Sequence, residues 1–294
     1  TFFFSDLTFA DSFVVPKRMG KNSVFYKPYS WKYVDFLRSS LSPQKNQGRL
    51  RLYFYDREKS LAEIAAYQMI ETISDLEKEF QFTLPYDFNY ILYNSHHEFK
   101  ENNTMEVDEN VLGVTNTFDL SMMLPYWGEH QRFRQVNYHE MVHEFTLQKL
   151  MKIKNDMQCD GSLSFRFPLW FIEGMAEYYS QKGDIDGESL VVIKDVIFHP
   201  VPERGYIIEN FFGNNDYNYL DTYKIGQLKI LFLTKFYGKE IIQNILDYSY
   251  LLSNCANGPK NEALPFEKYL ELILKNSSNE LNQKWEHFLK TNFF

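Results

Sequence analysis

Apolar residues repeat with two different periods along this chain, and that change of period constrains the fold more than any other feature. Residues 50–54 alternate apolar and polar positions, and a period of two predicts a half-buried strand. Residues 61–80 carry apolar side chains at three- and four-residue steps, which indicates an amphipathic helix. Ser60 and Glu63 form a capping box at its start. A strand followed by a helix therefore opens the main body of the chain.

The same two periods extend through the rest of the sequence. A strand is predicted at 88–93, a short helix capped by Ser95 and Glu98 follows it, and one or two further strands are predicted between Gly113 and Leu124. The remaining pattern is helical. The helices are predicted at 132–152, 168–183, 220–237, 240–251, 265–275 and 279–291. We therefore expect an α+β protein with a mixed α/β lobe followed by a mainly helical lobe.

The length of 294 residues suits one large bilobed domain or two small domains. We expect three segments along it. An irregular, aromatic lead-in covers 1–48 and ends in a polar loop. The α/β lobe with an edge strand covers 49–130, and the helical lobe covers 131–294.

Charge and hydropathy exclude two classes of partner. The net charge is −8 and no cluster of Lys and Arg is present, so nucleic acid is not an expected partner. No apolar run approaches the roughly 20 residues that cross a bilayer, so no membrane span is expected. The first residue is Thr1 rather than Met, which suggests that a signal peptide or an artificial boundary lies upstream. A periplasmic or secreted location is favoured over a cytoplasmic one.

The chain has two cysteines, Cys159 and Cys255, far apart and without Cys-x-x-Cys spacing. This pattern indicates neither a disulfide framework nor a thiolate metal site, and it leaves a single disulfide open.

The predicted helix at 132–152 contains the pattern His139-Glu140-x-x-His143. On a helix the two histidines are one turn apart on one face, so both imidazoles can bind one tetrahedral Zn²⁺. Glu140 leans towards the same metal. The alternative is that both histidines are solvated or capped on a helix surface.

A second helix strengthens the metal interpretation. Glu173 follows His143 by 30 residues and provides a third ligand, which leaves an open position for water as in a catalytic zinc site. Glu177, one turn later, can accept the second ring N–H of a ligand histidine, and His139 is the expected partner. The alternative is an ordinary solvated stripe of carboxylates, but the neighbours Trp170 and Tyr179 favour burial.

These two segments together resemble the gluzincin metallopeptidases. In that family a Glu within a Trp-x-x-Glu-Gly-x-Ala context completes the His-Glu-x-x-His helix, and residues 170–178 match this context. The chain is most similar to the bacterial peptidase MA-like domains, in which Tyr-x-x-Gly precedes an apolar helix ending in Tyr-Gly. Here those segments are 223–226 and 232–238, and the resemblance covers roughly 49–291.

The resemblance implies a gluzincin-type bilobed fold in which Tyr223 stabilises the oxyanion. It also implies that a strand in Gly113–Leu124 pairs with extended substrate. The Gly-x-Met-Glu-Asn segment of related aminopeptidases is absent, because the comparable stretch begins Gly113-Val114-Thr115-Asn116, so an aminopeptidase is disfavoured.

We therefore expect a zinc-dependent endopeptidase with one Zn²⁺ per chain and a peptide or protein substrate. His139, His143 and Glu173 bind the metal, and Glu140 is the general base. Two alternatives stay open. One is a zinc-retaining binding or scaffold domain without turnover, because related domains are often joined to a propeller-like module or partner that this chain lacks. The other is a metal-independent structural domain in which the motif is accidental.

Overall fold

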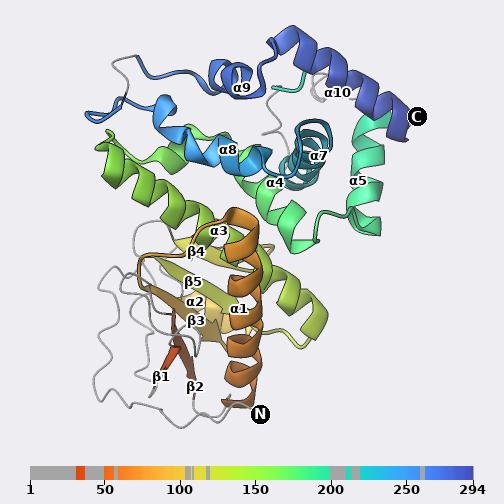
Figure 1. The fold of residues 1–294 in the computed structure, drawn as a ribbon. Coiled ribbons are helices and arrows are strands. Elements are labelled where there is room, and N and C mark those ends of the chain that lie inside the picture. The colour runs from red at the N-terminus through yellow and green to blue at the C-terminus, as the bar shows by residue number, and fades with distance from the viewer. Residues whose placement is uncertain are drawn as a thin grey trace. The chain divides into compact units, whose positions relative to one another are not determined.

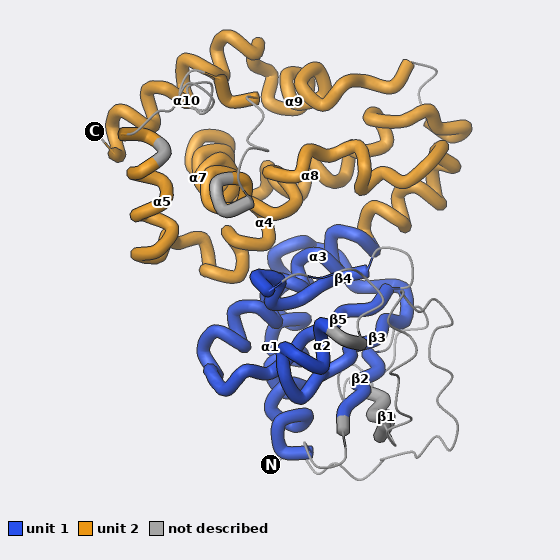
Figure 2. The backbone as a smooth tube through the Cα atoms, turned by 180° about the vertical axis from the view of Figure 1, so that it is seen from behind, with its two compact units in different colours: residues 1–148 blue, residues 149–294 orange. Residues whose placement is uncertain are grey.

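A computed structural model places helices and strands in an α+β arrangement, so the predicted fold class is confirmed at that level. The structure describes residues 31–36, 50–55, 59–102, 107, 109–116, 120–198, 210–212, 219–258 and 262–293. The chain divides into two compact units, residues 1–148 and 149–294 (Figure 2). The division therefore falls inside one long helix, whereas the lobe boundary expected from the sequence was at its start, near residue 130.

Unit 1 contains a five-stranded mixed sheet (Figure 1). The strands are β1 (Trp31–Phe36), β2 (Leu50–Tyr55), β3 (Phe88–Tyr93), β4 (Val114–Asn116) and β5 (Ser121–Pro125). Their spatial order is β1-β2-β3-β5-β4, with parallel pairing of β3 to both β2 and β5 and antiparallel pairing at each end. Among the described strands, the short strand β4 therefore lies at one edge of the sheet.

The two faces of this sheet are covered by different helices, namely α1 (Lys59–Phe80), α2 (His96–Asn102) and the first part of α3 (His130–Met157). Leu52, Tyr90 and Met122 are in register, so they share one face, and all three are buried. The Tyr90 hydroxyl donates to Asn137 Oδ1 on α3 at 2.5 Å, and Asn137 donates to Gln68 on α1. Both long helices therefore lie on the Tyr90 face.

The opposite face of the sheet packs against α2. Tyr93 and Met123 form a buried cluster there with Phe99 of α2. Partly buried side chains surround this cluster, among them Val111 and Val114. Because Val114 lies opposite Met123 in the β4–β5 register, the sheet places both on the α2 face.

The described residues of unit 2 form helices around an aromatic core. They are η3 (Leu163–Arg166), α4 (Leu169–Ser180), α5 (Gly187–Phe198), α7 (Tyr219–Tyr237), α8 (Ile241–Asp247), η4 (Ser249–Leu252), α9 (Phe266–Leu274) and α10 (Ser278–Phe293). The ring of Phe211 lies 5.5 Å from Trp170, 5.5 Å from Phe232 and 5.7 Å from Trp285, centroid to centroid. These tilted and edge-on contacts explain part of the high aromatic content of the chain.

Helices α4 and α7 cross with their backbones in direct contact at two glycines. A Cβ atom added to Gly174 would lie 2.3 Å from the carbonyl carbon of Gly226, and one added to Gly226 would lie 2.4 Å from the backbone oxygen of Trp170. Neither position therefore tolerates a side chain without moving a helix. The Glu-Gly and Tyr-x-x-Gly segments noted in the sequence thus meet at this crossing.

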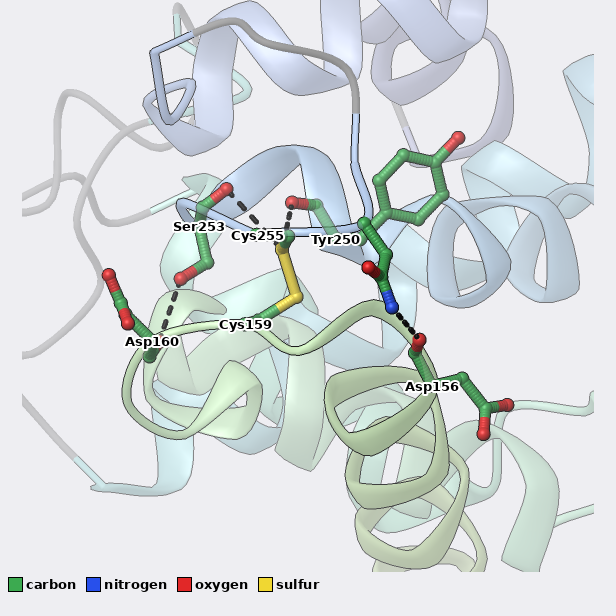
Figure 3. Close-up of a disulfide and its surroundings, with 7 residues drawn as sticks. Asp156, Cys159, Asp160, Tyr250, Ser253 and Cys255 are labelled. Atoms are coloured by element: carbon green, nitrogen blue, oxygen red, sulfur yellow. Dashed lines mark hydrogen bonds between the residues drawn. A yellow bond between two sulfur atoms is a disulfide. The ribbon is translucent and has the colours of Figure 1, made fainter.

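Cys159 and Cys255 form a disulfide (Figure 3). It joins the segment after α3 to the segment between η4 and α9, where the two cysteines also form an isolated antiparallel bridge. Backbone hydrogen bonds flank it, from Asp160 N to Asn254 O at 2.9 Å and from Ala256 N to Gln158 O at 3.1 Å. The question that the sequence left open is therefore answered.

The predicted elements are largely confirmed, with three differences. Strand β1 lies in the lead-in that was expected to be irregular, and the rest of 1–48 is outside the described residues. Helix α5 was not predicted as a separate element. The helix expected at 240–251 is divided into α8 and η4. Among the helices described, none is long and apolar enough to cross a membrane.

Candidate metal centre

Helix α3 presents His139 and His143 one turn apart, as the sequence predicts. Their Nε2 atoms are 3.1 Å apart and their rings are inclined at 79°. His139 is only 9% exposed. The helix is buried along much of its length around these residues, which gives the pair a rigid support.

Glu173, in the second turn of α4, joins this pair. One ring nitrogen from each histidine and one carboxylate oxygen of Glu173 all lie within 4.8 Å of one another. A tetrahedral ion with bonds of about 2.1 Å separates its ligand atoms by about 3.4 Å. The 3.1 Å spacing of the two nitrogens is close to that separation. The three predicted ligands are therefore close enough to bind one metal ion.

Glu140 follows the first histidine and lies against the edge strand β4. Its side chain is buried, at 5% exposure. The hydroxyl of Thr115 is 2.8 Å from Glu140 Oε2 and 3.1 Å from the backbone oxygen of the same residue. Gly113 lies against the other carboxylate oxygen, because a Cβ there would be 2.8 Å from Oε1. The predicted general base is thus held in contact with the edge of the sheet.

Tyr90 of β3 adds a buried phenol close to Glu140. Burial raises the pKa of Tyr90 well above 10, the hydrogen bond with Asn137 opposes this rise, and the negative charge of Glu140 adds to it. Tyr90 is therefore a neutral hydrogen-bond donor at physiological pH.

Glu177, one turn after Glu173 on α4, is held by residues of unit 2. Lys224 Nζ donates to Glu177 Oε2 at 2.6 Å, with side chains 9% and 12% exposed, and Gln181 Nε2 donates to the same oxygen at 3.1 Å. Its predicted hydrogen bond with His139 stays a prediction.

Tyr223 is half-buried on α7, next to Lys224 and three residues before Gly226. Its position on this helix agrees with the sequence prediction, and its oxyanion role stays a prediction.

Sequence reasoning missed three residues that contact the predicted site residues. In the sequence, Thr115 and Gly113 stand out only as a departure from the aminopeptidase pattern, and their contact with Glu140 depends on strand register. Lys224 was read only as part of Tyr-x-x-Gly. Lys224 stands beside Tyr223 in the sequence, whereas Gly113 and Thr115 lie only in the region of the predicted edge strand, and neither position identifies a contact partner.

Comparison with known protein families and with curated proteins found no match to this chain.

Proposed function

We propose that this protein is a zinc-dependent endopeptidase with a gluzincin-type active site and bilobed fold. The observation that carries the proposal is the group His139, His143 and Glu173, whose ligand atoms lie within 4.8 Å of one another beside a buried Glu140. Two imidazoles and one carboxylate leave a coordination position for water, as in hydrolytic zinc sites.

Zinc is favoured over other ions by the chemistry of the donors. Imidazole nitrogen suits Zn²⁺ well, whereas Mg²⁺ and Ca²⁺ prefer sites built from oxygen ligands. The 3.1 Å spacing of the two Nε2 atoms also agrees with a small tetrahedral ion. We therefore propose one Zn²⁺ per chain, bound by His139, His143 and Glu173.

The reaction we propose is attack of water on a peptide carbonyl. When bound, Zn²⁺ supplies a Lewis acid that activates water and stabilises negative charge on the carbonyl oxygen. Glu140 takes a proton from the attacking water and passes it to the leaving amine. In this proposal Tyr223 donates a hydrogen bond to the oxyanion. Glu177 accepts a hydrogen bond from the second ring N–H of His139.

Strand β4 provides the proposed binding edge for substrate. It is the last strand in the sheet order and pairs with β5 on one side. Its residue Thr115 contacts Glu140, so a peptide added to this edge as an extended strand would pass close to the general base. A peptide or protein substrate is therefore proposed.

We further propose that the protein works in an oxidising compartment, periplasmic or extracellular. The Cys159–Cys255 disulfide supports this, because structural disulfides persist in such compartments and are rare in the reducing cytosol.

The decisive experiment compares the parent protein with Glu140→Gln, using fluorescein-labelled casein and a quenched-fluorescent peptide library while zinc is measured in the same samples. We expect the parent to cleave and Glu140→Gln to retain zinc but lose turnover. The control is Glu129→Gln, which makes the same change at an exposed position just before α3 and should keep the parental rate.

The alternative is a zinc-retaining binding or scaffold domain. A parent protein with stoichiometric zinc and no cleavage of any probe would favour it and refute the endopeptidase proposal. A substrate cleft blocked by residues 1–48 would also favour this alternative. That segment lies largely outside the described residues.

A further inference from the structure

The register of β4 points one of its side chains towards helix α3. Thr115 lies opposite Met122, which shares its face with Tyr90, and that face carries α3. Val114, its neighbour, lies opposite Met123 on the α2 face. A slip of one residue would exchange these faces and remove the threonine from the helix.

The hydroxyl of Thr115 has a single hydrogen and two acceptors within reach. The carboxylate oxygen Oε2 of Glu140 is nearer, at 2.8 Å, than the backbone oxygen of Glu140, at 3.1 Å. A hydrogen bond to a charged acceptor is also the stronger one. The carboxylate therefore takes the hydrogen as principal acceptor. Because threonine is β-branched, few rotamers compete with the one that makes this bond.

Gly113 fixes the carboxylate from its other side. A Cβ atom at this position would lie 2.8 Å from Glu140 Oε1 and 2.9 Å from Glu140 Cγ, so the side chain packs against the glycine backbone. A donor at one oxygen and a steric wall at the other restrict rotation of the carboxylate. The Gly-x-Thr segment thus forms a clamp around Glu140.

We propose that Thr115 is a positioning residue, which orients the Glu140 carboxylate for proton transfer through its hydroxyl, with Gly113 leaving the space that the carboxylate needs. The inference rests on the proposed hydrolytic function. Positioning matters because a misplaced proton acceptor loses rate even when the substrate still binds. The clamp therefore acts on kcat rather than on KM or zinc content.

The test compares Thr115→Val, which keeps shape and β-branching, with Thr115→Ser, which keeps the hydroxyl. With labelled casein as substrate, we expect Thr115→Val to lose about ten- to a hundredfold in kcat at parental KM and zinc content. Thr115→Ser should stay within about threefold of the parent. The matched control is Thr146→Val on α3, whose buried hydroxyl has no hydrogen-bond partner among the described residues, and it should keep the parental rate.

A second readout needs no turnover. In metal-free protein, Thr115→Val should lower the urea midpoint of the parent by more than that of a Glu140→Met variant, because the variant has lost the carboxylate acceptor and keeps only the backbone oxygen at 3.1 Å. Equal shifts in both backgrounds would show that Thr115 does not act through Glu140.

The outcomes separate this inference from the function on which it rests. An active parent whose kcat is unchanged by Thr115→Val refutes the positioning role and leaves the peptidase intact. A zinc-loaded parent without activity refutes the peptidase and the role in turnover with it, while coupled midpoint shifts would preserve the structural clamp alone. A kcat loss in Thr115→Val that Thr115→Ser restores supports the inference.

Discussion

The contact between α4 and α7 predicts a large effect of the smallest substitution available, Gly174→Ala. The added methyl group would lie 2.3 Å from the carbonyl carbon, 2.5 Å from the oxygen and 2.8 Å from the Cα of Gly226. Carbon atoms in van der Waals contact are about 3.5–4.0 Å apart, so the helices must separate by about 1 Å. The clashing atoms belong to the backbone, so no side-chain rotation can relieve them.

The cost follows from two opposing effects. Overpacking of this kind costs typically about 1–3 kcal/mol, and the rigid backbone partner places Gly174→Ala at or above the upper end. The better helix propensity of alanine offsets about 1 kcal/mol of this destabilisation. We therefore expect a net loss of about 2–3 kcal/mol in the free energy of unfolding of unit 2. Zinc affinity should also fall, because Glu173 precedes the displaced residue.

Urea unfolding followed by tryptophan fluorescence measures this loss, since Trp170 and Trp285 are buried in unit 2. The control is Gly187→Ala at the start of α5, where an added Cβ meets no atom within 4 Å. It should leave stability unchanged or slightly higher. If Gly174→Ala is as stable as Gly187→Ala, the two helices do not touch at their glycines and the packing described for unit 2 is wrong.

Three further predictions concern single contacts. Lys224→Met should destabilise unit 2 by about 2–3 kcal/mol, because it leaves the Glu177 carboxylate mostly buried without its ammonium partner, and adding Glu177→Leu should recover most of that loss; a double variant no more stable than the single one would contradict this. Replacing both Cys159 and Cys255 with Ser should cost about 2–4 kcal/mol in urea unfolding, since the disulfide closes a loop of 96 residues, and an unchanged midpoint under non-reducing conditions would argue against the pairing. Tyr223→Phe should lower turnover about a hundredfold while zinc content stays parental, and an unchanged turnover would make Tyr223 a packing residue.

Local patterns in the sequence predicted most elements because their signals are short-range. The capping box of Ser95 and Glu98 is an example, since the Glu98 backbone N–H donates to the Ser95 hydroxyl at 3.2 Å at the start of α2. Helix α5 was not predicted because three of the four residues in its Leu-Val-Val-Ile run are β-branched, and such residues favour a strand. Its signal was Asp186, whose side chain accepts a hydrogen bond from Ser189 N at 2.7 Å and so caps the helix.

The ligands of the proposed metal group could be predicted from local sequence, whereas the contacts around them could not. His139 and His143 are fixed by helical spacing alone, and Glu173 was recognised from its neighbours. The contact of Thr115 with Glu140, in contrast, requires the order and register of β4 and β5. The approach of Gly174 to Gly226 requires the crossing of two helices separated by a long stretch of chain. Such long-range contacts are set by packing and not by any local period.

Zinc analysis of the purified chain tests the central claim most directly. After exhaustive dialysis against metal-free buffer, elemental analysis of the parent should give about one Zn²⁺ per chain, consistent with two imidazoles and one carboxylate as ligands. His139→Ala and His143→Ala should give close to none, whereas Glu140→Gln should match the parent. A parent without zinc, even after zinc is added before dialysis, or histidine variants that retain it fully, would contradict the proposed metal centre.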